Sequence, residues 1–151
     1  MINVFTVTIG GLRQLKKRYD NFGYFGRARL LQSFSAVTGA CLIIRKSIYN
    51  EVNGLDENIA VAYNDVDFCL RVREQGYRNV WTPFAELIHH ESATCGYDTT
   101  PEKVVRLRSE GQYVKNRWGN KLSEDPAYNP NLTIEAEDFS SAWPPRREIF
   151  T

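Results

Sequence analysis

Residues 64 to 71 constrain the fold of this chain most, because helical spacing of apolar residues coincides there with two carboxylates and an arginine. Apolar residues recur at steps of three and four from Val66 to Val72, and Gly76 follows where a helix usually ends. The octapeptide Asn-Asp-Val-Asp-Phe-Cys-Leu-Arg therefore predicts the opening turns of a helix with one buried face.

The two carboxylates of this helix are predicted to do different work. Because a helix turns about 100° per residue, Asp65 and Asp67 point in nearly opposite directions. Asp67 precedes Arg71 by one turn, which predicts a solvated ion pair contributing about 0.2–0.5 kcal/mol. Asp65 lies at the N-terminal end of the apolar stripe. From the residues alone it is either a first-turn acid stabilised by the helix dipole, which is the commoner case, or a catalytic base.

Length and charge bound the class of protein. The 151 residues are 42% apolar, and 19 Lys and Arg balance 18 Asp and Glu, so nucleic acid is not the expected partner. The basic run from Arg13 to Arg18 predicts a solvated face, with a phosphate contact as the alternative. We expect a single domain over residues 1–151, with an irregular lead-in at 1–35, a core at 36–119 and an extended tail at 120–151.

Cysteine usage bears on the compartment. Cys41, Cys69 and Cys95 are odd in number and lack Cys-x-x-Cys spacing, so they indicate neither a disulfide framework nor a thiolate zinc knuckle. A cytoplasmic location is expected. The sequence shows no export signal and no apolar run of the length that a membrane span needs, while peripheral association with a membrane stays open.

The strand pattern centres on one apolar run. Ala36 to Arg45 is almost continuously apolar around Cys41 to Ile44, which predicts a central strand buried on both faces. Pro83 cannot donate to a ladder and marks a bend or an edge. The remaining expectations are a short strand over Ile2 to Ile9, loop over Arg13 to Ser35, and β-prone runs at Tyr77 to Thr82 and Ala85 to His89.

Two further helices are predicted from their caps. Ser47 caps a short helix through Val52 that Gly54 closes. Thr100, followed by a proline at the first helical position, begins a longer helix that Gly119 ends. We expect the longer helix to pack across the sheet, with Trp118 completing its apolar face.

Several motifs follow one another in a defined order: Ala36-Val37-Thr38-Gly39-Ala40-Cys41, Gly54-Leu55-Asp56-Glu57, the octapeptide, Trp81-Thr82-Pro83-Phe84-Ala85-Glu86 and His89-His90-Glu91-Ser92. Over roughly residues 24–139 the chain resembles the C-terminal half of family 2 glycosyltransferases of the GT-A fold, closest to bacterial enzymes of surface or capsular polysaccharide. The resemblance implies an α/β protein with a partial GT-A fold, a mixed sheet flanked by helices that lacks the N-terminal nucleotide-binding half.

The resemblance also implies roles for single residues. Asp65 matches the general base that takes a proton from the acceptor hydroxyl as it attacks the anomeric carbon of a nucleotide sugar, with inversion; Asn64 stands where the family often has Glu. His89, with His90 as the fallback, matches a histidine that helps bind a divalent metal, Mn²⁺ or Mg²⁺. The candidate substrate-binding residues are Thr38, Gly39, Ala40, Asn64, Asp67, Arg71 and Trp81, although Arg71 is read first as the partner of Asp67.

Alternatives stand beside these roles. His89 and His90 are equally consistent with strand-end histidines bonded to backbone, and a zinc site with Cys95 would lack a fourth ligand. Trp81 and Tyr97 are candidates for sugar stacking. Val114 occupies the glutamine position of the Gln-x-x-Arg-Trp motif, which argues against a processive synthase.

The missing half limits what the chain is expected to do alone. No Asp-x-Asp metal motif precedes residue 36, so we expect the isolated chain to be an inactive glycosyltransferase fragment. The alternative is a non-catalytic remnant or interaction module that binds no nucleotide sugar. An open sheet edge also predicts that the chain self-associates.

Overall fold

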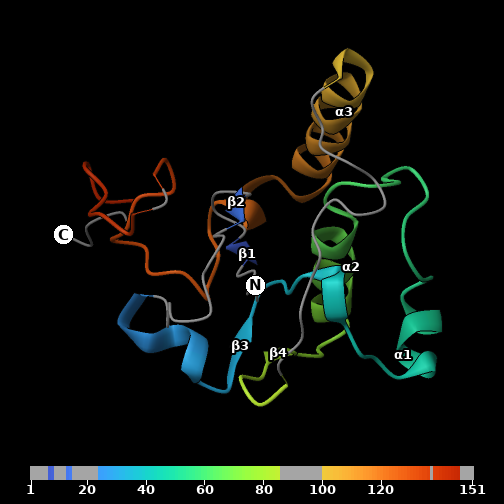
Figure 1. Cartoon of the computed structure of the whole chain (residues 1–151), viewed down its shortest axis with the longest axis horizontal. Coiled ribbons are helices and arrows are strands. Elements are labelled where there is room, and N and C mark those ends of the chain that lie inside the picture. The colour runs from blue at the N-terminus through green and yellow to red at the C-terminus, as the bar shows by residue number, and fades with distance from the viewer. Residues whose placement is uncertain (1–6, 9–12, 15–23, 86–99, 137, 147–151) are drawn as a thin grey trace.

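The structure is a computed structural model that describes residues 7–8, 13–14, 24–85, 100–136 and 138–146. The two longest described helices are α2 (Asn64–Glu74) and α3 (Pro101–Trp118), and α3 extends beyond α2 to the top of the view (Figure 1). The other elements are β1 (Val7–Thr8), β2 (Arg13–Gln14), β3 (Gln32–Phe34), β4 (Asn79–Trp81), α1 (Lys46–Glu51) and three 3₁₀ turns, η2 (Tyr24–Arg29), η3 (Gly39–Cys41) and η4 (Gly119–Leu122).

Helix α2 confirms the helix predicted from the octapeptide. Five apolar residues of α2 are buried, and the chain leaves the helix through Gly76, whose φ of 85° a glycine adopts without steric cost. The side chains of α2 divide between two apolar clusters. Val66, Cys69 and Leu70 meet α3, whereas Phe68 and Val72 meet the segment around α1.

Helix α3 is also confirmed, with Thr100 accepting the Lys103 N–H at 3.4 Å and Gly119 ending the helix at a φ of 49°. Its expected packing across a sheet is wrong. Val114 and Trp118 pack in the same apolar cluster as α2 residues, and the N-terminal turns of α3 project beyond this core (Figure 1). The apolar face of α3 therefore covers a helix.

The described strands form two antiparallel pairs, β1 with β2 and β3 with β4, instead of the expected mixed sheet flanked by helices. Residues 13–35 were expected to be loop, and within their described part they hold β2, η2 and β3. Strand β3 is short and two of its three residues, Gln32 and Ser33, are polar, so the alternation of apolar and polar residues that predicts a strand is absent. The strand is recognised only from its pairing with β4. Asn79 of β4 fastens this pair to α2, because its side-chain amide donates to the Ser35 and Cys69 carbonyls at 3.0 Å each.

The central strand predicted over Ala36 to Arg45 is wrong. The segment bends through η3, and its backbone N–H groups bond to the Thr38 hydroxyl and to a carboxylate on α2 instead of to a neighbouring strand. After the turn, Leu42 and Ile44 pack toward Phe68 of α2, while Ile43 is 96% exposed.

Three smaller expectations have mixed outcomes. Helix α1 begins at Lys46 with Arg45 at the cap position and no side-chain cap, so Ser47 lies inside the helix, while Gly54 does follow it at a φ of 64°. Ala85 is not in a strand, and residues 86–89 lie outside the described residues, as do most of residues 1–12.

In the tail, Arg146 donates to the carbonyls of Ser123, Asn129 and Leu132, which holds the turn-rich segment together.

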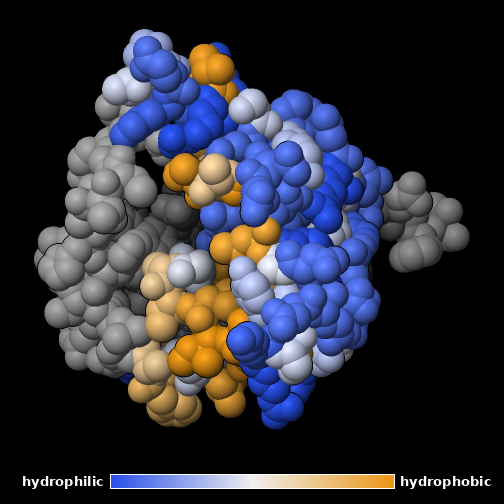
Figure 2. Space-filling view, turned by 90° about the vertical axis from the view of Figure 1, so that its right-hand side faces the viewer, coloured by the Kyte–Doolittle hydropathy of each residue, from blue (hydrophilic) through white to orange (hydrophobic). Residues whose placement is uncertain are grey.

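The surface on the side of α1 is divided in character. Figure 2 shows a strip of hydrophobic surface beside a larger hydrophilic area on this face. Large apolar side chains more than four-fifths exposed are Phe25, Ile43, Phe84 and Trp143. Single exposed apolar side chains are common on protein surfaces, whereas a continuous strip such as that in Figure 2 is typical of surfaces that contact other molecules.

Candidate active site

Asp65 lies in the first turn of α2 and is fixed by a residue 26 positions earlier in the chain. Its Oδ2 accepts the Gly39 N–H at 2.9 Å, and its Oδ1 accepts the Val66 N–H at 2.9 Å. The side chain is neither fully buried nor fully exposed. A Cβ on Gly39 would lie 3.3 Å from Cβ of Asp65, so the glycine permits this close approach.

The segment that carries Gly39 is anchored at a second point on the same face of α2. The Cys69 thiol accepts the Val37 N–H at 3.5 Å and donates to the Val37 carbonyl at 3.6 Å. Burial raises the pKa of Cys69 to about 12, so the group stays a thiol and can make both contacts. Asp65 and Cys69 thus hold residues 37–39 at points one helical turn apart.

The turn of Thr38, Gly39 and Ala40 lies beside Asp65, with Gly39 donating to its carboxylate. The Thr38 hydroxyl accepts the Ala40 N–H at 3.2 Å and so caps η3. Gly39 and Ala40 are exposed, whereas Asn64, the first residue of α2, is half-buried. A ligand that reaches Asp65 would therefore meet backbone of the 38–40 turn, and substrate binding by these residues stays a prediction.

The residue before α2 has an unusual backbone conformation. Tyr63 has a φ of 63°, in the left-handed region that bulky residues rarely occupy, and provides no side-chain cap. Helix α3 contacts this turn at two neighbouring residues. Glu110 Oε2 accepts the Ala62 N–H at 2.7 Å, and a Cβ on Gly111 would lie 3.2 Å from the Tyr63 ring. The two residues that lead into the first turn of α2, where Asp65 lies, therefore contact α3.

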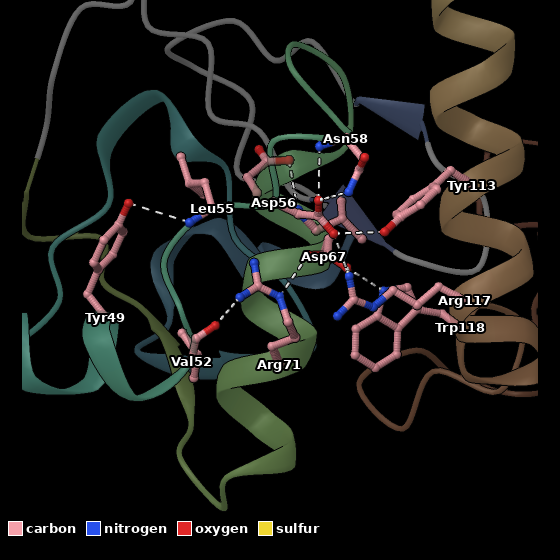
Figure 3. A network of polar contacts seen from close by, with 12 residues as sticks. Tyr49, Val52, Leu55, Asp56, Asn58, Asp67, Arg71, Tyr113, Arg117 and Trp118 are labelled. Atoms are coloured by element: carbon pink, nitrogen blue, oxygen red, sulfur yellow. Dashed lines mark hydrogen bonds and ion pairs between the residues drawn. The ribbon is translucent and has the colours of Figure 1, made fainter.

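Asp67 corrects the expectation of a solvated ion pair. Its side chain is 0% exposed, and its carboxylate binds three donors: Arg71 Nε at 2.8 Å, Trp118 Nε1 at 3.0 Å and Arg117 Nη1 at 3.2 Å (Figure 3). Arg71 is 12% exposed and also donates to the Val52 carbonyl. The expected Asp67–Arg71 pair is present, but α3 buries it, and a carboxylate enclosed in this way joins α2 to α3.

The same network reaches the Gly-Leu-Asp-Glu motif. Asp56 Oδ2 accepts from Arg117 Nη1 at 2.7 Å and from the Tyr113 hydroxyl at 2.9 Å. Its Oδ1 accepts from the backbone and side-chain N–H groups of Asn58 at 2.9 and 2.8 Å. These bonds, led by the Asn58 backbone N–H, lower the pKa of Asp56 from 3.8 to about 2.

Figure 3 shows the residues of this network converging between α2 and α3. Arg117 joins the carboxylates of Asp56 and Asp67, and the sequence reading did not anticipate that role. Asp67 is fully buried among these partners, whereas Arg71 Nη2 is buried without a hydrogen-bond partner among the described residues. Contact of either residue with substrate stays a prediction. Glu110 was also missed, although a carboxylate on the apolar face between Leu107 and Val114 is a recognisable signal.

Trp81, at the end of β4, is half-buried, and within the described residues its indole Nε1 has no hydrogen-bond partner. Its role in sugar stacking stays a prediction.

His89, His90, Cys95 and Tyr97 lie outside the described residues. In the part of the chain that the structure describes, no three His, Cys, Asp or Glu side chains gather as a metal site. No described helix is both long and apolar enough to cross a bilayer.

Sequence comparison finds several relatives, some of which have names that state a function. The chain is 54% identical over 121 residues to an uncharacterized protein, y4gI, of Sinorhizobium fredii, covering 80% of this chain and 13% of that protein. It is 38% identical over 114 residues to the O-antigen biosynthesis protein RfbC of Myxococcus xanthus, covering 76% of this chain and 9% of the relative. It is 30% identical over 81 residues to an N-acetylglucosaminyl-diphospho-decaprenol L-rhamnosyltransferase of Mycobacterium tuberculosis, covering 54% and 26%.

The chain spans from 9% to 26% of the length of these relatives. No family model matches the sequence, and no solved structure matches it. The names of two relatives, one for O-antigen biosynthesis and one for a rhamnosyltransferase, support a glycosyltransferase kind of protein related to polysaccharide biosynthesis.

Proposed function

We propose that this chain forms the acceptor side of an inverting glycosyltransferase active site of the GT-A type, with Asp65 as the general base. The observation that carries the proposal is the pair of hydrogen bonds that fix the partly exposed Asp65 carboxylate, from Gly39 and from Val66. A base has to be held at one position relative to the acceptor hydroxyl, because misplacement by about 1 Å can cost 10²-fold in rate.

The proposed step transfers one sugar. The acceptor oxygen attacks the anomeric carbon of a nucleotide sugar from the face opposite the nucleoside diphosphate, so the new glycosidic bond forms as the bond to phosphate breaks. The acceptor proton passes to the Asp65 carboxylate, and the nucleoside diphosphate leaves with the bonding electron pair. A sugar hydroxyl is a weak nucleophile, so a positioned base can contribute about 10²–10⁴-fold to the rate.

The leaving diphosphate needs charge compensation. A bound Mn²⁺ or Mg²⁺ would supply it as a Lewis acid, and His89 with His90 are the residues proposed to hold the ion. The 38–40 turn is proposed to line the acceptor subsite, and the exposed Gly39 and Ala40 leave room for a saccharide at the backbone. A cytoplasmic location fits the nucleotide-sugar substrate that we propose.

The proposal is tested by binding to this chain. Saccharide acceptors should shift the NMR signals of the Gly39 and Ala40 amides, and Asp65→Asn should weaken that response. Calorimetry with Mn²⁺ and UDP- or dTDP-sugars tests whether the chain binds a donor by itself. Saccharide that moves only signals remote from the 38–40 turn would contradict an acceptor site at Asp65.

A second candidate is a non-catalytic module that contacts another protein. It is favoured by the exposed apolar side chains, of which Ile43 is 96% exposed. For such a module we expect that the chain binds neither saccharide nor nucleotide sugar. We also expect it to self-associate through the exposed surface around Ile43. The same titrations therefore separate the two functions.

A further inference from the structure

We propose that helix α3 positions Asp65 through the turn before α2, with Glu110 and Gly111 as positioning residues. The inference rests on the proposed role of Asp65 and names residues that no motif assigns to it. Its starting point is the left-handed Tyr63, at a φ of 63°, two residues before Asp65. Such a conformation is strained for a bulky residue and persists only where surrounding contacts enforce it.

The contacts that enforce this turn come from two adjacent residues of α3. Glu110 is 5% exposed, and its carboxylate accepts the Ala62 N–H at 2.7 Å. Gly111 is buried, and the Tyr63 ring lies against it so closely that an added Cβ would be 3.2 Å from Cε2. One contact holds the backbone of the turn and the other sets the position of the ring, so together they fix where α2 begins.

The start of α2 sets the position of Asp65. The Tyr63 carbonyl accepts the Asp67 N–H at 3.0 Å, so the turn and the first helical turn move as one unit. On the far side of Asp65, the Gly39 N–H bonds to Oδ2 at 2.9 Å. Asp65 is therefore held between α3 and the 38–40 turn. A displacement of Tyr63 should reach Gly39 through Asp65.

Gly111→Ala separates positioning from folding. Glycine is unfavourable inside a helix, so alanine adds helix propensity that opposes the strain of its tight contact with Tyr63, and the chain should stay folded. Its Cβ should nevertheless displace the Tyr63 ring by a few tenths of an ångström. Ser109→Ala, on an exposed neighbouring residue of α3, also raises helix propensity without approaching Tyr63 and is the matched control.

The first measurement uses this chain and needs no activity. We expect Gly111→Ala to shift the Gly39 amide resonance in ¹H–¹⁵N NMR spectra and to speed its hydrogen exchange, while Ser109→Ala leaves both unchanged. Glu110→Ala should have the same effect as Gly111→Ala, and Glu110→Gln, which keeps an acceptor oxygen for the Ala62 N–H, should largely restore the native spectrum. An unmoved Gly39 resonance in a folded Gly111→Ala chain would overturn the coupling.

The second measurement uses a longer glycosyltransferase relative that carries the same glycine, tyrosine and aspartate. The substitution equivalent to Gly111→Ala should lower kcat roughly tenfold or more with KM unchanged, because the base is misplaced while substrate contacts persist. If the variant equivalent to Gly111→Ala keeps its kcat while the variant equivalent to Asp65→Asn loses activity, the positioning role is overturned. The assignment of Asp65 as the base then still stands. Full activity after Asp65→Asn would remove the base assignment itself.

Discussion

The Gly39 N–H lies 2.9 Å from Oδ2 of Asp65, although the two residues are 26 positions apart in the chain. This hydrogen bond joins the η3 turn to the first turn of α2 and leaves the carboxylate partly exposed. A first-turn acid that served only the helix dipole would need no such partner from another segment. The relationship therefore supports Asp65 as a positioned functional group.

The buried Asp67 carboxylate should be essential for stability. Asp67→Ala leaves the largely buried Arg71 without its counter-charge and removes one of the two carboxylates that bind Arg117, and we expect a loss of about 3–5 kcal/mol in the free energy of unfolding. Urea denaturation followed by tryptophan fluorescence measures the loss. Glu124→Ala, at an exposed residue, is the control and should stay within about 0.5 kcal/mol. Equal stability of the two variants would contradict the described network.

Trp118 is predicted to matter for its N–H as well as for its ring. Trp118→Phe keeps much of the apolar contact but removes the donor that lies 3.0 Å from Asp67 Oδ1, which should cost about 1–3 kcal/mol. Trp143 is 91% exposed, so Trp143→Phe is the matched control and should change little. In NMR spectra the Trp118 indole N–H should exchange with solvent far more slowly than that of Trp143, and the opposite order would refute its burial against Asp67.

Asp56 makes stability depend on pH at the acid end. Its pKa is lowered from 3.8 to about 2 in the folded chain, so the unfolded chain binds the proton more readily. The resulting stabilisation is complete above about pH 4 and is lost as the pH falls toward 2. The difference in urea midpoint between the natural chain and Asp56→Asn should therefore be larger at pH 7 than at pH 2. A difference independent of pH would show that this carboxylate titrates normally.

The periodic helices could be predicted from sequence, and their partners could not. Spacing and caps were sufficient for α2 and α3 and for the opposite directions of Asp65 and Asp67. The predicted solvation of Asp67 was wrong because Arg117 and Trp118 of α3 bind its carboxylate, a long-range contact that helical periodicity does not contain. The run from Ala36 to Arg45 looked like a strand because composition does not show that its N–H groups bond to Asp65 and Thr38.

Self-association stays a prediction, and the exposed apolar side chains offer a test. Ile43→Lys should raise the monomer fraction in light scattering, because Ile43 is 96% exposed and contributes little to the core. Val105→Lys on α3, where Val105 is 64% exposed, adds the same charge elsewhere and serves as the control. A chain that is already a monodisperse monomer at high concentration would rule the prediction out.

The most direct test of Asp65 as the base is a rate measured under single-turnover conditions. In a longer glycosyltransferase relative that carries the Asn-Asp-Val-Asp motif, the substitution equivalent to Asp65→Asn keeps the size of the side chain and an oxygen for the glycine N–H, but it removes the proton acceptor. We expect sugar transfer to fall by about 10²–10⁴-fold with donor binding retained. Transfer at the natural rate in this variant would contradict this expectation.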